Sequence, residues 1–182
     1  RKHLLDVLGQ YITPAAKKRD DLCCGLHQYD HTFIHGIPYD VANVVEARDR
    51  YQSPVFERWQ KAVREENSKE TEAIAGKVID LGNEITLTIL TPNKSYNGIT
   101  LKNPHEANVT AMLRYGSFEV LLTGDMEMPM ERRLLLDGTD ISADVLKVGH
   151  HGSKTSTTQQ FLDGVEPEVA FIQVGKNRYG HP

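Results

Sequence analysis

Histidine and aspartate residues gather directly after candidate β-strands, and this placement constrains the fold more than any other feature of the sequence. Asp125 ends the apolar run that begins at residue 121, and His150 and His151 follow the run 143–148. A third group, between residues 27 and 35, follows the candidate strand 22–25. Strand ends in a layered α/β fold open onto one crevice, so these groups are predicted to converge.

The residue types in these groups predict a metal site. Imidazole and carboxylate together suit zinc, manganese or iron. A shared carboxylate can hold two such ions close together. The candidate residues are His27, Asp30, His31, His35, Asp125, His150 and His151.

The hydrophobic pattern predicts one domain of mixed α/β or α+β class spanning residues 1–182. Strands are expected over 22–25, 77–81, 85–90, 109–115, 118–123, 143–148 and 169–174. Helices are expected over 3–12 and 38–48, from Ser53-Pro54, over 130–136, and from a Ser156-x-x-Gln159 capping box. The turn at Gly82-Asn83 and the turn at Gly116-Ser117 each predict a hairpin.

Composition narrows the function further. The chain has 182 residues, 39% of them hydrophobic, which is enough for a packed core. A net charge of −4 excludes histone-like binding of nucleic acid, but not an enzyme that cuts one phosphodiester in a local pocket. There is no run of 18 apolar residues, so no membrane segment is expected. The compartment and the oligomeric state are left open.

Other catalytic arrangements fit the sequence poorly. The adjacent Cys23 and Cys24 form neither a disulfide framework nor a CxxC pair, and their apolar surroundings argue against a nucleophile. The segment 149–155 lacks the spacing of a phosphate-binding P-loop. Ser153 lacks the GxSxG context of a serine nucleophile, and a hydroxyl that orders the turn after His151 is the simpler interpretation.

Three strings carry a resemblance to a known family. They are Thr123-Gly124-Asp125, the segment Ala143–Ser153 with Gly-His-His-Gly-Ser, and Val174–Pro182 with its final Gly-His-Pro. In this order they resemble consecutive motifs of the metallo-β-lactamase-like hydrolases. The similarity is to the branch that contains the C-terminal domain of ComEC-type competence proteins and phosphorylcholine esterases, and it runs from about Leu4 to the end.

The resemblance implies a four-layer αββα sandwich with two divalent metal ions at one edge of two facing sheets. The ions would be zinc, with manganese or iron as alternatives. Asp125 matches the carboxylate that bridges both metals, and His150 matches a histidine ligand. His151 would line the site or orient substrate, with the two histidine roles open to exchange. His181 matches a histidine at the pocket rim that could bind phosphate.

The sequence departs from the family pattern in its first metal motif, HxHxDH. Asp30 and His31 match the last two ligands, but Leu26 and Gln28 occupy the places of the two earlier histidines. His27 lies one position out of register and could bind metal only if the loop is rebuilt. His35 is either a compensating ligand or a surface residue. The chain is also expected to lack the family's first hairpin and last helix.

The function implied is hydrolysis of a phosphodiester by a metal-bound hydroxide, with Asp30, His151 and His181 as catalytic residues. The substrate would be a nucleic acid or a phosphorylcholine-type ester, with His151 and His181 binding it. Lys154 and Arg178 could add positive charge, or lie in solvent. One alternative is a degenerate module with one metal or none and no catalysis. A lactamase-like amide or lactone hydrolase would need the same metals.

Overall fold

The computed structural model describes residues 43–182 apart from 51, 66 and 68. The expected helix 3–12, the expected strand 22–25, and the candidates Cys23, Cys24, His27, Asp30, His31 and His35 lie outside the described residues. Two sheets and three α-helices make up the described part. The helices are α2 (Pro54–Glu65), α3 (Met128–Leu136) and α4 (Gln159–Val165).

The larger sheet has six strands in sequence order. They are β3 (Val78–Gly82), β4 (Ile85–Thr91), β5 (Thr110–Tyr115), β6 (Phe118–Leu122), β7 (Val145–Lys147) and β8 (Val169–Phe171). The pairs from β3 to β6 are antiparallel, which confirms the two predicted hairpins. The pairs β6–β7 and β7–β8 are parallel, and α3 and α4 lie in the crossovers between them. The carboxyl ends of β6 and β7 are therefore neighbours.

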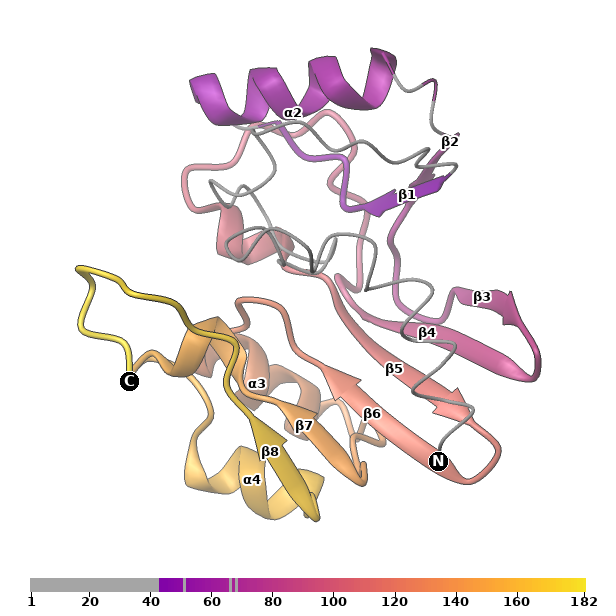
Figure 1. Cartoon of the computed structure of the whole chain (residues 1–182), viewed down its shortest axis with the longest axis vertical. Coiled ribbons are helices and arrows are strands. Elements are labelled where there is room, and N and C mark those ends of the chain that lie inside the picture. Colours follow the sequence, from indigo (N-terminus) through magenta and orange to yellow (C-terminus); the bar gives the residue numbers. More distant parts are fainter. Residues whose placement is uncertain (1–42, 51, 66, 68) are drawn as a thin grey trace.

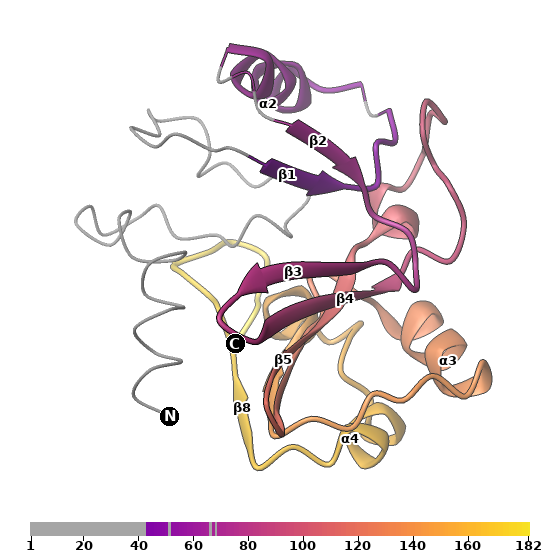
Figure 2. The same ribbon diagram turned by 90° about the vertical axis from the view of Figure 1, so that its right-hand side faces the viewer.

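The smaller sheet pairs β1 (Asn43–Glu46) with β2 (Lys69–Glu72) in parallel. In both views α2 lies beyond this sheet, and α3 and α4 lie on the other side of the large sheet (Figures 1 and 2). The layers thus follow the order helix, small sheet, large sheet, helices. This order confirms the mixed α+β class and the αββα layering that the resemblance implied.

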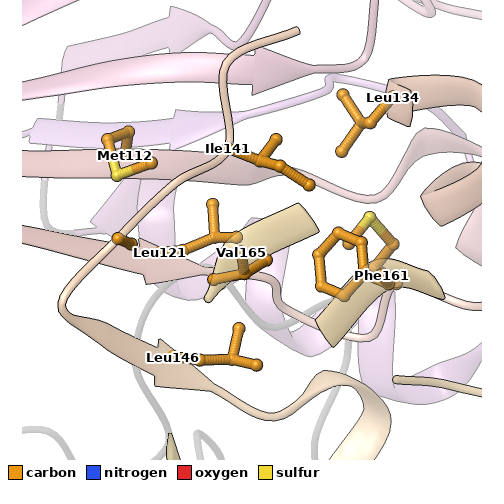
Figure 3. Close-up of a cluster of buried hydrophobic side chains, with 9 residues drawn as sticks. Met112, Leu121, Leu134, Ile141, Leu146, Phe161 and Val165 are labelled. Carbon is orange, nitrogen blue, oxygen red and sulfur yellow. The ribbon is translucent and has the colours of Figure 1, made fainter. Parts of the chain in front are cut away.

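A hydrophobic core joins the large sheet to α3 and α4 (Figure 3). Met112, Leu121 and Leu146 point from three adjacent strands toward the two helices. Phe161 and Val165 meet them from α4, and both side chains are fully buried. Burial of a side chain of this size stabilises the fold by about 1.5–3 kcal/mol. This core fixes β6 and β7, the strands after which Asp125 and His150 lie.

A second core lies between the two sheets. Ile89 and Ala111 from the large sheet pack with Ala47 and Ala73, which follow the two strands of the small sheet. Ala107 belongs to the same cluster, and it ends the short 3-10 helix η3 (Pro104–Ala107). The polar loop before β5 is thereby anchored at its carboxyl end. Among the described residues, none of the helices is long and apolar enough to cross a membrane.

Two of the expected local structures are wrong. A helix was expected over 38–48, but the described part of this segment forms the strand β1, in which Val44 and Val45 pair with β2. The polar sequence of β2, Lys-Glu-Thr-Glu, gave no signal for a strand. The helix after residue 156 begins with Thr158 as its cap, whose hydroxyl accepts from the Phe161 N–H. Thr157 has a left-handed φ of 55°, so the helix cannot extend back to Ser156.

Glu46 on β1 has an unusual environment for a carboxyl group. Burial, together with the neighbouring Glu70 and Asp49, raises the pKa of Glu46 to about 8, while Arg48 opposes the shift. The folded state therefore holds a proton that the unfolded chain releases near pH 4.5. The contribution of this bound proton to the free energy of unfolding is complete below pH 4.5 and is lost as the pH rises toward 8.

We expect Glu46→Gln to remove this loss. At pH 8.5 the variant should be more stable than the wild type by about 1–2 kcal/mol, a figure discounted for the partial exposure of the site. At pH 4 the two proteins should match. Urea unfolding at both pH values measures the difference, with the exposed Glu57→Gln on α2 as control. Equal pH profiles for wild type and Glu46→Gln would contradict the shift.

Candidate functional site

The loop after β6 places Asp125 at the edge of the large sheet. Asp125 is 5% exposed, and its backbone N–H donates to Asn108 Oδ1 at 2.8 Å. The Asn108 amide donates in turn to the Thr123 carbonyl (2.9 Å) and to Thr110 Oγ1 (3.0 Å). One asparagine from the loop before β5 thus holds both ends of Thr123-Gly124-Asp125. The sequence analysis assigned no role to Asn108.

Gly124 in this loop cannot carry a side chain. Its φ is +58°, and an added Cβ would lie 2.6 Å from Asn108 Oδ1 and 3.0 Å from the Val109 carbonyl oxygen. We therefore expect Gly124→Ala to destabilise the chain by about 2–4 kcal/mol. Gly138→Ala is the matched control, because Gly138 has φ +65° but nothing within 4 Å. Chemical denaturation should separate the two variants. Equal losses would mean that only φ matters, not the contact with Asn108.

The turn after β7, Gly149–Gly152, has a strained backbone. His150 (φ 43°, ψ 47°) and His151 (φ 53°, ψ 29°) are consecutive left-handed residues, a conformation that costs a non-glycine residue about 1–2 kcal/mol. Hydrogen bonds hold the turn: His150 N–H donates to the Gly124 carbonyl (3.1 Å), and Ser156 Oγ donates to the Gly149 carbonyl (2.7 Å). Strain of this kind is typical of functional sites.

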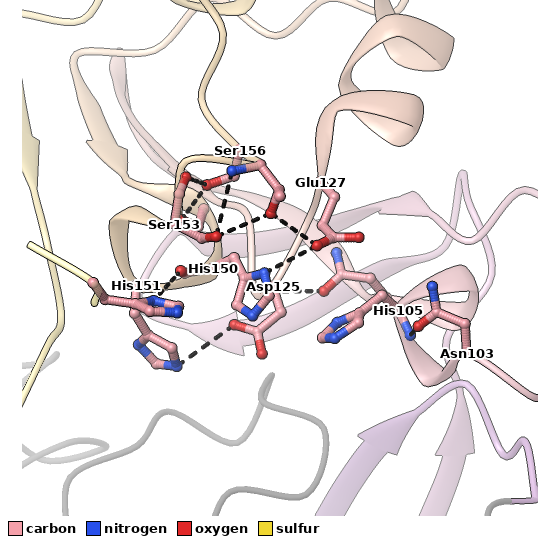
Figure 4. Close-up of polar contacts among 12 residues, drawn as sticks. Asn103, His105, Asp125, Glu127, His150, His151, Ser153 and Ser156 are labelled. Atoms are coloured by element: carbon pink, nitrogen blue, oxygen red, sulfur yellow. Dashed lines mark hydrogen bonds and ion pairs between the residues drawn. The ribbon is translucent and has the colours of Figure 1, made fainter. Parts of the chain in front are cut away.

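A hydrogen bond to a backbone carbonyl fixes the orientation of the His151 ring (Figure 4). Its Nδ1 lies 2.5 Å from the Gln173 carbonyl oxygen, and its Nε2 lies 3.7 Å from Asp125 Oδ1. A carbonyl oxygen only accepts, so Nδ1 carries the proton of this hydrogen bond. Nε2 is thereby directed at the carboxylate. An imidazole fixed through its other nitrogen in this way is typical of metal ligands.

His150 faces a different group of residues. Its Nδ1 lies 3.3 Å from Glu127 Oε1, and its ring lies 4.8 Å from that of His105, centroid to centroid. Burial lowers the pKa of His150, with further lowering by His105 and His181 and an opposing effect of Asp125 and Glu127. Within the described residues, Nδ1 of His150 and Nδ1 of His105 are buried without a hydrogen-bond partner.

His181 closes the cluster from the carboxyl-terminal segment. Its Nδ1 lies 3.1 Å from the His150 carbonyl oxygen, and its ring centroid lies 5.3 Å from that of His150 and 6.3 Å from that of His151. The neighbouring Pro182 fills the space beside Gly152, where a Cβ would come within 2.4 Å of it. The segment 174–182 is therefore tied to the turn.

The structure thus brings together four of the predicted site residues: Asp125, His150, His151 and His181. It adds three that the sequence analysis missed, namely His105, Glu127 and Asn108. Glu127 lies two residues after Asp125, and that proximity was the only signal for it. His105 lies on η3, where Asn103 Oδ1 accepts from its backbone N–H, and its approach to His150 has no sequence signature.

The described residues fit part of a metal site. Carboxylate and imidazole donors meet here, and the buried Nδ1 of His150 makes no hydrogen bond within the described residues, although Glu127 Oε1 lies 3.3 Å away. No group of three or more His, Cys, Asp or Glu residues within the described ranges is arranged to hold a metal ion. The candidates His27, Asp30 and His31 lie outside those ranges.

No protein-family model matches the chain. ComE operon protein 3 of Bacillus subtilis (strain 168) is 32% identical over 145 residues, which are 79% of this chain and 18% of that protein. Competence protein ComA of Neisseria gonorrhoeae is 38% identical over 85 residues, 44% of this chain and 12% of that protein. Recombination protein 2 of Haemophilus influenzae is 49% identical over 61 residues, 34% of this chain and 8% of that protein.

The chain is a homologue of ComEC-type competence proteins. The resemblance predicted from the three motifs is thereby confirmed. The chain spans less than a fifth of the length of these relatives, at 18% for ComE operon protein 3. Their names describe the whole proteins.

Two solved structures resemble the fold at low identity. CmlA, a diiron beta-hydroxylase from Streptomyces venezuelae, has a TM-score of 0.41 and 11% identity, and the match covers 70% of this chain and 30% of CmlA. Zn(2+)-bound PqqB from Methylobacterium extorquens has a TM-score of 0.30 and 12% identity, and covers 58% of this chain and 37% of PqqB.

Proposed function

We propose that this chain is a metal-dependent hydrolase of phosphodiester bonds. The observation that carries the proposal is the meeting of Asp125 with His150, His151 and His181 at the carboxyl ends of β6 and β7. Carboxylate and imidazole donors at one edge of a sheet suit divalent transition metals. The strained turn and the buried Asn108 that position them indicate a site built for binding rather than a surface cluster.

The metal ligands in this proposal are Asp125 and His150 among the described residues. Asp30 and His31 join them on the strength of the sequence motif, and His27 does so if its loop compensates for the shifted register. Zinc suits this donor set, and manganese or iron would also fit it. When bound, two such ions supply a nucleophilic water at neutral pH and polarise the phosphoryl group.

The histidines of this chain would handle the substrate. In hydrolysis the water oxygen forms a bond to phosphorus, the ester P–O bond breaks, and the departing alkoxide takes up a proton. His181 donates its Nδ1 proton to the His150 carbonyl, which leaves its Nε2 directed away from that bond. Binding a phosphoryl oxygen at Nε2 needs an N–H there as well, so His181 and His151 are proposed to bind the phosphoryl oxygens as imidazolium rings, whose two nitrogens both donate, and to stabilise the developing charge. Asp30 is proposed as the third catalytic residue.

The substrate class is proposed as nucleic acid or a phosphorylcholine-type ester. The names of the relatives concern competence and recombination, which favours nucleic acid. The net charge of −4 favours a local pocket over an extended phosphate-binding surface. A lactamase-like amide or lactone substrate would use the same residues.

Turnover of bis(p-nitrophenyl) phosphate by the purified chain tests the proposal, with and without added Zn2+ or Mn2+. Metal-dependent release of p-nitrophenol is expected. His181→Ala should lower kcat/KM, because the proposal gives His181 both a contact with the substrate and a developing charge to stabilise. Tyr115 on β5 is partly buried against a different hydrophobic cluster and is not in the site, so Tyr115→Phe serves as control. The absence of turnover with every metal would exclude the hydrolase.

A second candidate is a module that keeps the fold but holds one metal or none and has no catalysis. It is favoured by Leu26 and Gln28, which occupy the places of two family ligands. The lack of a three-residue metal group among the described residues points the same way. If this second function holds, Gln28→His should raise the metal content of the chain. An unchanged metal content would count against it.

A further inference from the structure

Lys147, the last residue of β7, is a buried cation that the proposed chemistry does not use. Its side chain is 1% exposed and is among the largest that are fully buried. Moving an ammonium group out of water costs several kcal/mol, so such a lysine persists only where its hydrogen bonds serve a purpose. Within the described part of the chain, no carboxylate forms an ion pair with it.

The partners of Lys147 are two backbone carbonyls. Its Nζ donates to the Gly124 oxygen at 3.1 Å and to the Val148 oxygen at 3.4 Å. Gly124 directly precedes Asp125, and Val148 directly precedes the turn that carries His150 and His151. One ammonium group therefore joins the two loops that hold the candidate ligands.

The contact at Gly124 is shared with the turn itself. The Gly124 oxygen accepts both from Lys147 Nζ and from the His150 backbone N–H, each at 3.1 Å. The backbone of Lys147 is fixed too, because its carbonyl accepts from Thr123 Oγ1 at 2.6 Å. The loop after β6 thus contacts Lys147 twice: Thr123 donates to its backbone carbonyl, and its Nζ donates to the Gly124 carbonyl. These bonds join the loop that carries Asp125 to the turn that carries His150.

We infer that Lys147 is a positioning residue that sets the separation of Asp125 and His150 for metal binding. This inference rests on the proposed function. Methionine has a similar length and would fill the same space, and it removes the cost of burying the ammonium group. The purpose of the lysine is then the geometry of the two loops, not the stability of the core.

The test is the dissociation constant of Zn2+ for the purified chain, measured by calorimetric titration in the wild type, Lys147→Met and Lys147→Arg. Loss of a residue that orients ligands lowers metal affinity by about 10- to 100-fold. That loss is expected for Lys147→Met, with a thermal midpoint of the metal-free protein equal to or above that of the wild type. Lys147→Arg keeps the charge and donors and should lose less. Lys61→Met, an exposed lysine on α2, is the matched control.

Two results would overturn the inference. One is a folded Lys147→Met that binds Zn2+ as tightly as the wild type. The other is a failure of both variants to fold, which would make Lys147 a residue of stability. If the wild type itself binds no Zn2+, the proposed function fails instead, so the two failures are distinguishable.

Discussion

Asp125→Asn should lower the metal-dependent phosphodiesterase rate by about 100- to 1,000-fold. The amide keeps the shape of the side chain, but it loses the negative charge that the proposal assigns to metal binding. The backbone hydrogen bond from Asp125 to Asn108 does not involve the carboxylate, and the carboxylate lies as far as 3.7 Å from His151 Nε2, so the free energy of unfolding should change by about 1 kcal/mol or less. Initial rates at saturating metal and urea unfolding measure the two quantities.

Asp163→Asn is the control for this experiment. Asp163 is exposed on α4, on the helix side of the large sheet, where its carboxylate accepts from Gln159. Both its rate and its stability should match the wild type. An Asp125→Asn rate equal to that of the wild type would mean that Asp125 does not hold the metals.

Glu131→Ala should have the largest effect on stability. Glu131 on α3 is 1% exposed, and its carboxylate accepts from the Thr157 N–H, the Thr158 N–H (3.0 Å) and the Thr158 hydroxyl (2.9 Å). Alanine leaves these donors without an acceptor in a part-buried site, at a cost of about 1–3 kcal/mol each. We expect a loss of about 3–5 kcal/mol in the free energy of unfolding, measured by urea denaturation.

Glu131→Ala should also loosen the turn that carries His150 and His151. Thr157 Oγ1 accepts from the Gly149 N–H at 3.1 Å, so Glu131 holds the amino end of the histidine turn through Thr157. Glu131→Gln keeps one carbonyl oxygen as acceptor and should lose only about half as much stability. If Glu131→Ala is as stable as the wild type, the carboxylate does not anchor the segment 157–158.

Much of the large sheet could be predicted from the sequence, because its hairpins have apolar strands joined by Gly82-Asn83 and Gly116-Ser117. The sequence also predicted that Asp125 and His150 lie near each other, because both come directly after strands. Those strands, β6 and β7, are parallel neighbours in the sheet. The apolar face of α4 was equally clear, and Phe161 and Val165 are fully buried.

The strand β2 could not be predicted, because its polar residues Lys69–Glu72 have no alternating pattern and its pairing with β1 crosses an intervening helix. His105 was missed for a related reason. Its place beside His150 depends on the packing of Ala107 between the sheets, which is a tertiary contact. Lys147 reads in the sequence as an ordinary strand-end lysine, and only its burial reveals the link between the two loops.

Elemental mass spectrometry of the purified chain, alongside turnover of bis(p-nitrophenyl) phosphate, tests the central claim most directly. The proposed hydrolase predicts about two metal ions per chain, lost together with turnover on chelation and restored together by Zn2+ or Mn2+. A folded chain that holds no metal after incubation with these ions, and turns over no phosphodiester, would contradict the claim.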